Sequence, residues 1–403
     1  MARKMKDSGI EWIGEIPEDW KLSKLKWFVK IKSGEYLNKN KFIDDGNVDV
    51  FGANAKLGNY DKSNIKKKTI VTGRVGTLGT FDIKDNVWIT DNVLAIDVLN
   101  ANLNFVYYFF HIINFEELAS STAQPLITAT KLYNINFSFP TNLEQNKISD
   151  FLDIKTKEIY RVKSIITKEI QTLEDYKKSV ITEAVTKGLD KNIEMKDSGI
   201  EWIGEIPKHW ELNKGKYILK LLKKPVKDSD EVITCFRDGE VTLRSKRREE
   251  GFTFADKEIG YQGIDVGDLV VHGMDGFAGA IGISDSRGKG SPVLNVLDSI
   301  CEKRYLMFYL RAMSYSDIFS ALATGIRVRS VDLRWNKLAN LPYPLPSKDE
   351  QNKIANFIEN ELYKTDSLIS TKQKQLQILE EYKKSLIYEY VTGKKEVEDV
   401  GTI

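Results

Sequence analysis

The chain is poor in the residues on which disulfide-rich and metal-dependent folds rely. Only two of its 403 residues are cysteine and three are histidine. Two cysteines cannot form a disulfide framework or a zinc site by themselves, so a reducing, cytoplasmic compartment is expected. The three histidines, His111, His209 and His272, are scattered without metal-ligand spacing, and no metal site is expected.

Long apolar runs are also absent. The most apolar stretches, residues 108–113 and 267–274, are far shorter than the roughly 20 residues that cross a bilayer. The first ten residues are polar and charged, unlike a signal peptide. We therefore expect no membrane association. The formal net charge is only +2, so any affinity for nucleic acid must come from local clusters of Lys and Arg.

Motifs of nucleotide and methyl-transfer chemistry are missing as well. The glycines of residues 73–79 do not match a dinucleotide fingerprint, and there is no phosphate-binding P-loop. The tetrapeptides N-P-P-Y and D-P-P-Y, which amino-methyltransferases use on a flipped base, do not occur. His272 and Asp275 lie close together among glycines, where a tight turn is favoured over a catalytic pair. No catalytic residue and no cofactor are expected in this chain.

The chain does contain two pairs of repeated segments. Residues 5–20 read MKDSGIEWIGEIPEDW, and residues 195–210 repeat them except at two positions. A second pair, which includes EQNKI at 144–148 and 350–354, recurs at an offset of 206 residues. The chain is therefore a tandem duplication, in which a short repeat, a variable region and a second repeat occur twice in the same order.

Each second repeat is predicted to form a long helix. Apolar residues recur every seven positions from Leu152 through Ile159 and Ile166 to Val180, and residues 144–187 contain no Pro or Gly. A sustained apolar heptad on a charged helix needs a partner helix, and its own duplicate is the obvious one. The alternative is two separate surface helices, each packed on its neighbouring domain.

The variable regions contain short β-branched and aromatic runs between Gly and Asn turns, followed by one helical segment each, 104–114 and 302–313. The expected fold is α+β, with two α/β domains separated by two long antiparallel coiled-coil helices in a pseudo-two-fold tandem repeat. The predicted parts are a repeat segment (1–20), a first domain (21–140), a first helix (141–188), a linker with the second repeat copy (189–210), a second domain (211–345), a second helix (346–394) and a tail (395–403).

Clusters of basic residues in the two variable domains are the candidates for DNA contact. Arg can bind guanine with two hydrogen bonds, while Lys clusters mostly contact the phosphate backbone. For any single residue, an ordinary solvated charge is the alternative. The candidates are Lys62, Lys66, Lys67, Lys68 and Arg74 in the first domain, and Arg237, Arg244, Lys246, Arg247, Arg248, Arg327 and Arg329 in the second.

Residues repeated at exposed helical positions are the candidates for a protein interface. Identities between the two long helices crowd at their starts and ends and include charged residues that core packing does not require. A surface that is present twice suits a partner that docks twice. The tryptophans of the short repeat could complete that surface or close the helical junction. The candidates are Trp12, Trp20, Glu174, Lys177, Lys178, Trp202, Trp210, Glu380, Lys383 and Lys384.

This pattern resembles the specificity (S) subunit of type I restriction–modification enzymes. The residues that carry the resemblance are SGIEWIGEIPEDW and its copy, LPYPLPSKDEQNKIANFI, TGIRVRSVDLRW and MDGFAGAIGIS. The resemblance covers essentially the whole chain. It implies a non-catalytic subunit in which each variable domain reads one half of a split target in double-stranded DNA.

The resemblance also implies partners. Two methyltransferase (M) subunits would bind the repeats, and restriction (R) subunits would join the larger complex. S-adenosylmethionine, ATP and Mg²⁺ would belong to those partners. Two other functions stay open at this point. One is a coiled-coil protein scaffold without sequence-specific DNA binding, and the other is a self-contained nuclease or methyltransferase, which the missing motifs disfavour.

Overall fold

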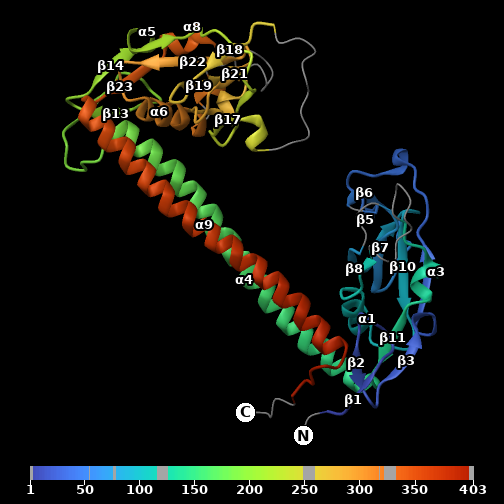
Figure 1. The fold of residues 1–403 in the computed structure, drawn as a ribbon. Coiled ribbons are helices and arrows are strands. Elements are labelled where there is room, and N and C mark those ends of the chain that lie inside the picture. Colours follow the sequence, from blue (N-terminus) through green and yellow to red (C-terminus); the bar gives the residue numbers. More distant parts are fainter. Residues whose placement is uncertain are drawn as a thin grey trace. The chain divides into compact units, whose positions relative to one another are not determined.

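A computed structural model describes residues 3–53, 55–75, 79–115, 126–247, 259–316, 318–321 and 333–398 (Figure 1). The chain forms two compact units, Met1–Thr167 with Gln373–Ile403, and Lys168–Lys372. Each unit therefore combines one variable domain with part of both long helices. Arg248, Arg327 and Arg329 lie outside the described residues.

The first unit is built on a four-stranded antiparallel sheet of order β4-β10-β7-β8. The two central strands, β7 (Thr69–Gly73) and β10 (Val93–Val98), are mostly buried, as their β-branched residues favour. Helix α1 (Leu103–Phe110) shares a core with this sheet. The remaining elements are β1 (Met5–Asp7), β2 (Glu15–Pro17), β3 (Lys21–Lys24), β4 (Val29–Ser33), β5 (Val48–Phe51), β6 (Lys56–Tyr60), β8 (Phe81–Lys84), β9 (Trp88–Ile89), α3 (Ala129–Tyr133) and β11 (Asn136–Phe139).

The second unit repeats this plan with a sheet of order β15-β22-β19-β20. Helix α6 (Lys303–Tyr315) takes the place of α1. The other elements are β12 (Met195–Asp197), β13 (Glu205–Pro207), β14 (Glu211–Lys214), α5 (Gly215–Ile218), β15 (Leu219–Leu221), β16 (Ile233–Cys235), β17 (Val241–Leu243), β18 (Gln262–Ile264), β19 (Leu269–His272), β20 (Ile281–Ile283), β21 (Gly288–Gly290), β22 (Leu294–Ser299), α7 (Ile318–Ala321), α8 (Trp335–Asn340) and β23 (Pro342–Leu345).

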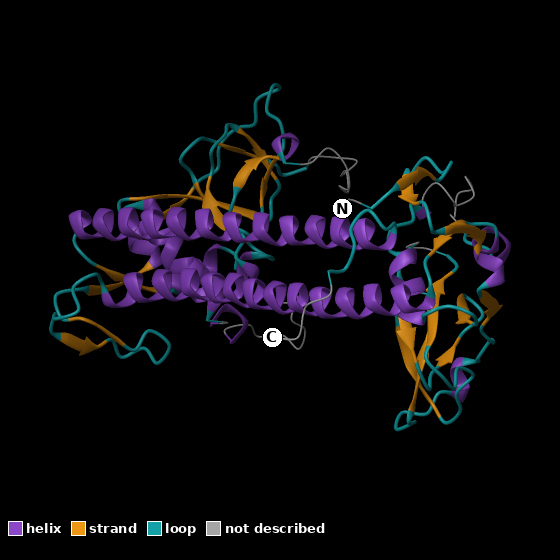
Figure 2. Cartoon of the chain, turned by 90° about the horizontal axis from the view of Figure 1, so that it is seen from below, coloured by secondary structure: helices purple, strands orange, loops and turns teal. Residues whose placement is uncertain are grey.

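The long helices are α4 (Asn142–Lys187) and α9 (Lys348–Val391), drawn as the long purple coils in Figure 2. In the first unit Phe151 packs on Tyr390, and Lys163 pairs with Glu380. In the second unit Glu169 pairs with Lys372. As the residue number rises from Phe151 to Lys163 along α4, the number of the contacting residue in α9 falls from Tyr390 to Glu380. The two helices are therefore antiparallel.

The heptad positions form the seam between these helices. Leu152, Ile159 and Ile166 are buried, as are Ile358 and Ile369 of the partner helix. The expected fold class is confirmed, and the alternative of two separate surface helices is wrong. No helix within the described residues is long and apolar enough to cross a membrane.

One polar residue that interrupts the heptad of α9 is also buried in this seam. Thr365 is only 3% exposed, and its hydroxyl donates to the carbonyl of Glu361 at 2.7 Å. The hydroxyl therefore satisfies its hydrogen bond within its own helix, which limits the cost of burying it.

Candidate nucleic-acid interface

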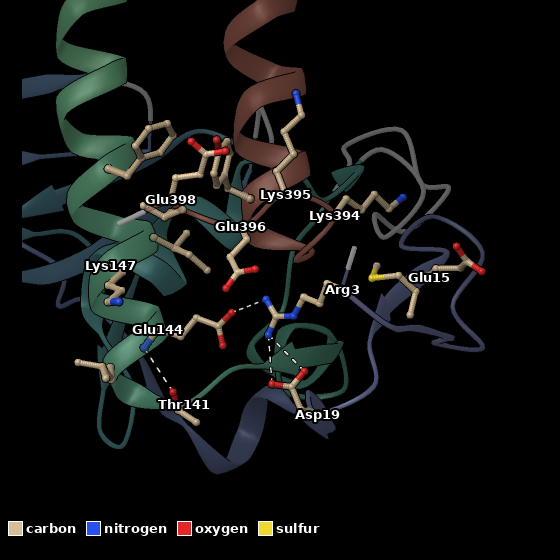
Figure 3. Close-up of a pocket in the computed structure, with 16 residues that line it drawn as sticks. Arg3, Glu15, Asp19, Thr141, Glu144, Lys147, Lys394, Lys395, Glu396 and Glu398 are labelled. Atoms are coloured by element: carbon tan, nitrogen blue, oxygen red, sulfur yellow. Dashed lines mark hydrogen bonds and ion pairs between the residues drawn. The ribbon is translucent and has the colours of Figure 1, made fainter. Parts of the chain in front are cut away.

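In the first unit, the repeat segment is attached to the start of α4 through a buried tryptophan. Trp20 is 1% exposed, and its indole nitrogen donates to Glu144 Oε2 at 3.1 Å. Glu144 Oε1 accepts a hydrogen bond from Arg3 at 2.6 Å, and Arg3 also contacts Asp19 at 3.1 Å (Figure 3). The carboxylate of Glu144 thus ties both the tryptophan and the N-terminal arginine to the first turn of the helix.

The second unit builds the same joint with Ile193 at the position of Arg3 and a histidine at the position of Asp19. Trp210 is completely buried, and its indole nitrogen donates to Glu350 Oε1 at 3.0 Å. His209 Nε2 lies 2.8 Å from the other oxygen of Glu350. His209 corresponds to Asp19, one of the two positions at which the repeats differ. A direct histidine–carboxylate contact therefore replaces the arginine-bridged arrangement of the first unit.

A buried glutamine completes each joint. The side chain of Gln145 accepts a hydrogen bond from the backbone nitrogen of Asn102 at 2.8 Å and donates to the carbonyl of Pro140 at 3.0 Å. Gln351 makes the equivalent bonds to Glu302 and Pro346, both at 2.9 Å. Asn102 and Glu302 are the N-cap residues of α1 and α6. The repeated Glu-Gln pair therefore fixes each long helix to its sheet domain.

Each short repeat also covers the end of the opposite helix. Ile387 and Val391 of α9 share a buried core with Ile16 and Trp20. In the second unit, Ile181 and Val185 of α4 share a core with Ile206 and Trp210. One repeat segment thus holds the start of one long helix and the end of the other. This geometry explains why the chain carries the segment twice.

The expected partner-binding role of Trp20 and Trp210 is therefore corrected, because their side chains are buried and close the helical junction. Trp12 is more accessible, with 36% of its surface exposed and its ring 6.0 Å from Phe109. Trp202 is half-buried against the core of the second unit. Of the four tryptophans of the short repeats, these two keep exposed area that a partner could contact.

Three of the six repeated charges near the ends of the long helices, Lys177, Glu380 and Lys383, contact the neighbouring helix. Lys177 donates to Asp366 at 2.6 Å. Its counterpart Lys383 donates to the hydroxyl of Tyr160 at 3.4 Å. Tyr160 occupies the position in α4 that corresponds to Asp366 in α9. Interhelical contact is thus a reason for the repeated lysines that does not require a partner. Of the other candidates, Glu174 pairs with Lys177, Lys178 pairs with Asp175 and is exposed, and Lys384 is exposed.

Glu380 is the most strongly perturbed carboxyl of this group. Hydrogen bonds from Lys163 at 2.5 Å and Lys383 at 2.7 Å lower the pKa of its carboxyl to about 2. A carboxyl whose pKa is lower in the folded chain contributes stability above its unfolded pKa, which is 4.5 here, and loses that contribution as the pH falls toward 2.

We expect Glu380→Gln to flatten the loss of stability between pH 4.5 and pH 2, because the variant lacks the carboxylate that must be protonated there. Urea unfolding at pH 6 and at pH 3 measures the effect. Glu174→Gln at the duplicated position is the control, since Glu174 contacts only Lys177, at 3.5 Å, among the ion pairs of the described residues. An identical acid dependence in wild type and Glu380→Gln would contradict the pairing.

The basic candidates of the first domain occupy two settings. Lys62, Lys66, Lys67 and Lys68 are exposed on the segment before β7, and Lys67 lies 3.7 Å from Asp97. Arg74 is half-buried after β7 and donates to Ser33 Oγ at 3.3 Å. Its Nε atom is buried without a hydrogen-bond partner in the part of the chain that the structure describes.

In the second domain most candidates are paired with carboxylates of the same domain. Arg237 donates to Asp275 at 3.0 Å. Arg247 pairs with Asp238 and Glu240 and lies over the ring of Phe236 at 4.1 Å. The remaining described candidates, in the turn Arg244–Lys246, are held by Thr234, Ser286 and Asp285. A DNA phosphate would have to compete with these carboxylates.

His272 is part of a turn, as the sequence favours. Its Nδ1 atom accepts hydrogen bonds from the backbone nitrogens of Met274 at 3.2 Å and Asp275 at 2.9 Å. Burial lowers the pKa of His272, and the carboxylate of Asp275 is engaged by Arg237. The side chains of His272 and Asp275 therefore organise the loop that follows β19.

Comparisons with known proteins agree on one family. A family model described as the type I restriction modification DNA specificity domain matches residues 17–174. The chain is 22% identical to the MjaX specificity subunit of Methanocaldococcus jannaschii, and the match covers 95% of each chain. It is 23% identical to the MjaVIII type I restriction enzyme specificity subunit of the same organism, with 96% of this chain and 95% of that one covered.

A solved structure adds evidence on the fold. It is described as the structural basis underlying complex assembly and conformational transition of the type I R-M system. The match covers 94% of this chain and 99% of that one, with a TM-score of 0.68 and 11% identity. The family model and both relatives are therefore of one kind, the solved structure shares the fold, and the chain is similar over nearly its whole length to specificity subunits of type I restriction–modification systems.

Proposed function

We propose that this chain is the non-catalytic subunit that reads a bipartite DNA target and directs adenine methylation and restriction by partner subunits. The observation that carries the proposal is the duplicated architecture. Two units share sheet order, joint and helical seam, while their candidate DNA-binding residues differ. Two domains with different surfaces suit two different half-sites, and binding through both raises the affinity of each by effective concentration.

The same duplication suits two copies of one methyltransferase subunit. The joints and helix ends repeat, so each unit offers a similar surface to an identical partner. S-adenosylmethionine, ATP and Mg²⁺ would be held by the methyltransferase and restriction subunits. Within the described ranges, no group of three His, Cys, Asp or Glu side chains could hold a metal ion.

The triple variant Arg244→Ala/Arg247→Ala/Arg248→Ala is expected to weaken DNA binding by the assembled methyltransferase. Three lost phosphate or base contacts would lower the affinity by roughly tenfold or more and reduce the salt dependence of binding. Fluorescence polarisation on a target duplex at several salt concentrations measures both effects. Unchanged affinity would show that these arginines do not belong to the DNA-binding surface.

Asp238→Asn is a control that is expected to change the DNA affinity in the opposite direction. Hydrogen bonding from Arg247 lowers the pKa of the Asp238 carboxyl, so this aspartate is ionised and competes with DNA for the guanidinium. Removing its charge is expected to tighten DNA binding, while Glu240 continues to hold Arg247 in place. If Arg247 served only the fold of the domain, both the alanine and the asparagine variants would weaken binding.

A further inference from the structure

A turn after the first strand pair carries the same side chains in both units. In the first unit, Lys24, Lys26 and Trp27 lie at the end of β3 and in the short helix η1 (Leu25–Trp27). At an offset of 190 residues, Lys214, Lys216 and Tyr217 lie at the end of β14 and in α5. These residues belong to the variable domains, yet two lysines and one aromatic ring recur in the same places.

The backbone holds the two turns in the same way. The nitrogen of Leu25 donates to the carbonyl of Ile135 at 2.9 Å, and the nitrogen of Gly215 donates to the carbonyl of Leu341 at 3.0 Å. The neighbouring strand pairs, β3 with β11 and β14 with β23, are equivalent as well. Each turn is therefore anchored to the same strand pair in its own unit.

The aromatic rings of these turns point to solvent. Trp27 is 64% exposed and Tyr217 is 65% exposed. The ammonium group of Lys26 lies 4.8 Å from the Trp27 ring, and that of Lys216 lies 4.9 Å from the Tyr217 ring. Such exposed rings contribute little to the core, so packing within the unit does not explain why they recur.

The charged residues that line the hollow beside the first turn have a single sign. This hollow of about 520 Å³ is lined by Ser8, Gly9, Leu22 and Trp27, and among the described residues the charged side chains that line it are those of Lys24 and Lys26. Residues 21–34 and 212–227 contain no Asp or Glu.

None of the four lysines forms a salt bridge within the described residues. They differ in this respect from Arg237 and Arg247, which are neutralised by carboxylates of their own domain. The two turns therefore offer unneutralised positive charge at equivalent places.

We propose that Lys24, Lys26 and Trp27, with Lys214, Lys216 and Tyr217, form two equivalent sites for the phosphate backbone of duplex DNA. The inference rests on the proposed function. Surfaces that read different half-sites must differ in their base contacts, whereas the phosphate backbone is the same at both. The sites would thus supply affinity without sequence preference.

The composition favours DNA over a protein partner. Lysine is depleted at protein–protein interfaces, and interfaces with DNA are far more positively charged. Lys30 and Lys220, which follow on strands β4 and β15, are left out of the sites because they lie opposite Asp97 and Asp298 in the sheets.

The test compares Lys24→Ala/Lys26→Ala and Lys214→Ala/Lys216→Ala with the wild-type chain, each assembled with its methyltransferase subunits. Affinity is measured by fluorescence polarisation over a salt series, on a duplex that carries the methylated motif and on one that lacks it. Each double variant is expected to lose roughly tenfold in affinity on both duplexes. The slope of log affinity against log salt should fall by about 1.8, for two phosphate contacts at about 0.9 each.

Lys24→Arg/Lys26→Arg is the matched control, since it retains both charges and should bind as the wild type does. Equal affinity and salt slope for the alanine and wild-type complexes would overturn the proposal. A loss of methyltransferase subunits from the alanine variants, measured by light scattering, would also overturn it and identify a protein-docking surface. Failure of the proposed function is distinguishable, because the wild-type complex itself would then show no preference between the two duplexes.

Discussion

Alanine in place of Trp210 is expected to lower the free energy of unfolding by about 3–5 kcal/mol, among the largest effects of any single substitution in the chain. The side chain is completely buried, and it contacts both the start of α9 through Glu350 and the end of α4 through their shared core. Its loss leaves a cavity at the point where both helices meet the second domain. Urea unfolding, combined with hydrogen exchange of the residues around the joint, measures the loss.

Two further variants separate packing from hydrogen bonding at this joint. Trp210→Phe keeps most of the apolar volume and removes the indole donor, so it should cost about 1.5–3 kcal/mol, the range for a hydrogen bond to a charged group. Trp12→Ala is the surface control, because Trp12 is 36% exposed. A Trp210→Ala variant no less stable than Trp12→Ala would show that Trp210 does not hold the helices.

Seven extra residues in each long helix are expected to change the recognised DNA target. The insertions are placed between Thr167 and Lys168 of α4 and between Lys372 and Gln373 of α9, where Glu169 and Lys372 show that the helices are neighbours. Seven helical residues add about 10.5 Å, equal to about three base pairs of duplex DNA. If the helices set the gap between half-sites, methylation moves to a motif with a gap about three base pairs longer, or it is lost.

A variant with Lys168→Ala and no change of length controls for effects of sequence at the insertion point, and it should keep the original motif. Sequencing that detects methylated adenines reads the result for each variant. Methylation of the original motif by the lengthened chain would show that helix length does not determine the gap.

Much of this fold could be predicted because the chain repeats itself. The heptad from Leu152 to Ile166 predicted the buried seam, and the repeated order of segments predicted two similar units. Both signals are local or internal to one sequence, so they need no knowledge of tertiary contacts. The strand-rich runs before α1 and α6 likewise formed the two sheets.

The roles of individual repeated residues could not be predicted in the same way. A tryptophan in a repeat can pack inward or face a partner, and only the contact with Glu144 or Glu350 shows that Trp20 and Trp210 face inward. Lys177 has the same ambiguity, because heptad position alone does not reveal a partner such as Asp366 on another helix.

Charge clusters were the least predictable feature. Arg247 is conspicuous in the sequence, but its neutralising partners Asp238 and Glu240 lie seven to nine positions away and become neighbours only in the folded domain. The pair Lys24 and Lys26 is less conspicuous and has no such partner among the described residues. Alignment of the two halves at an offset of 190 residues was the signal that could have identified it.

The most direct test of the central claim is a map of methylated adenines in cells with this gene present and with it deleted. A subunit that reads two half-sites predicts one motif of two short specified parts around a fixed unspecified gap, which disappears when the gene is deleted. A motif that persists after deletion, or one that is continuous, would contradict the claim.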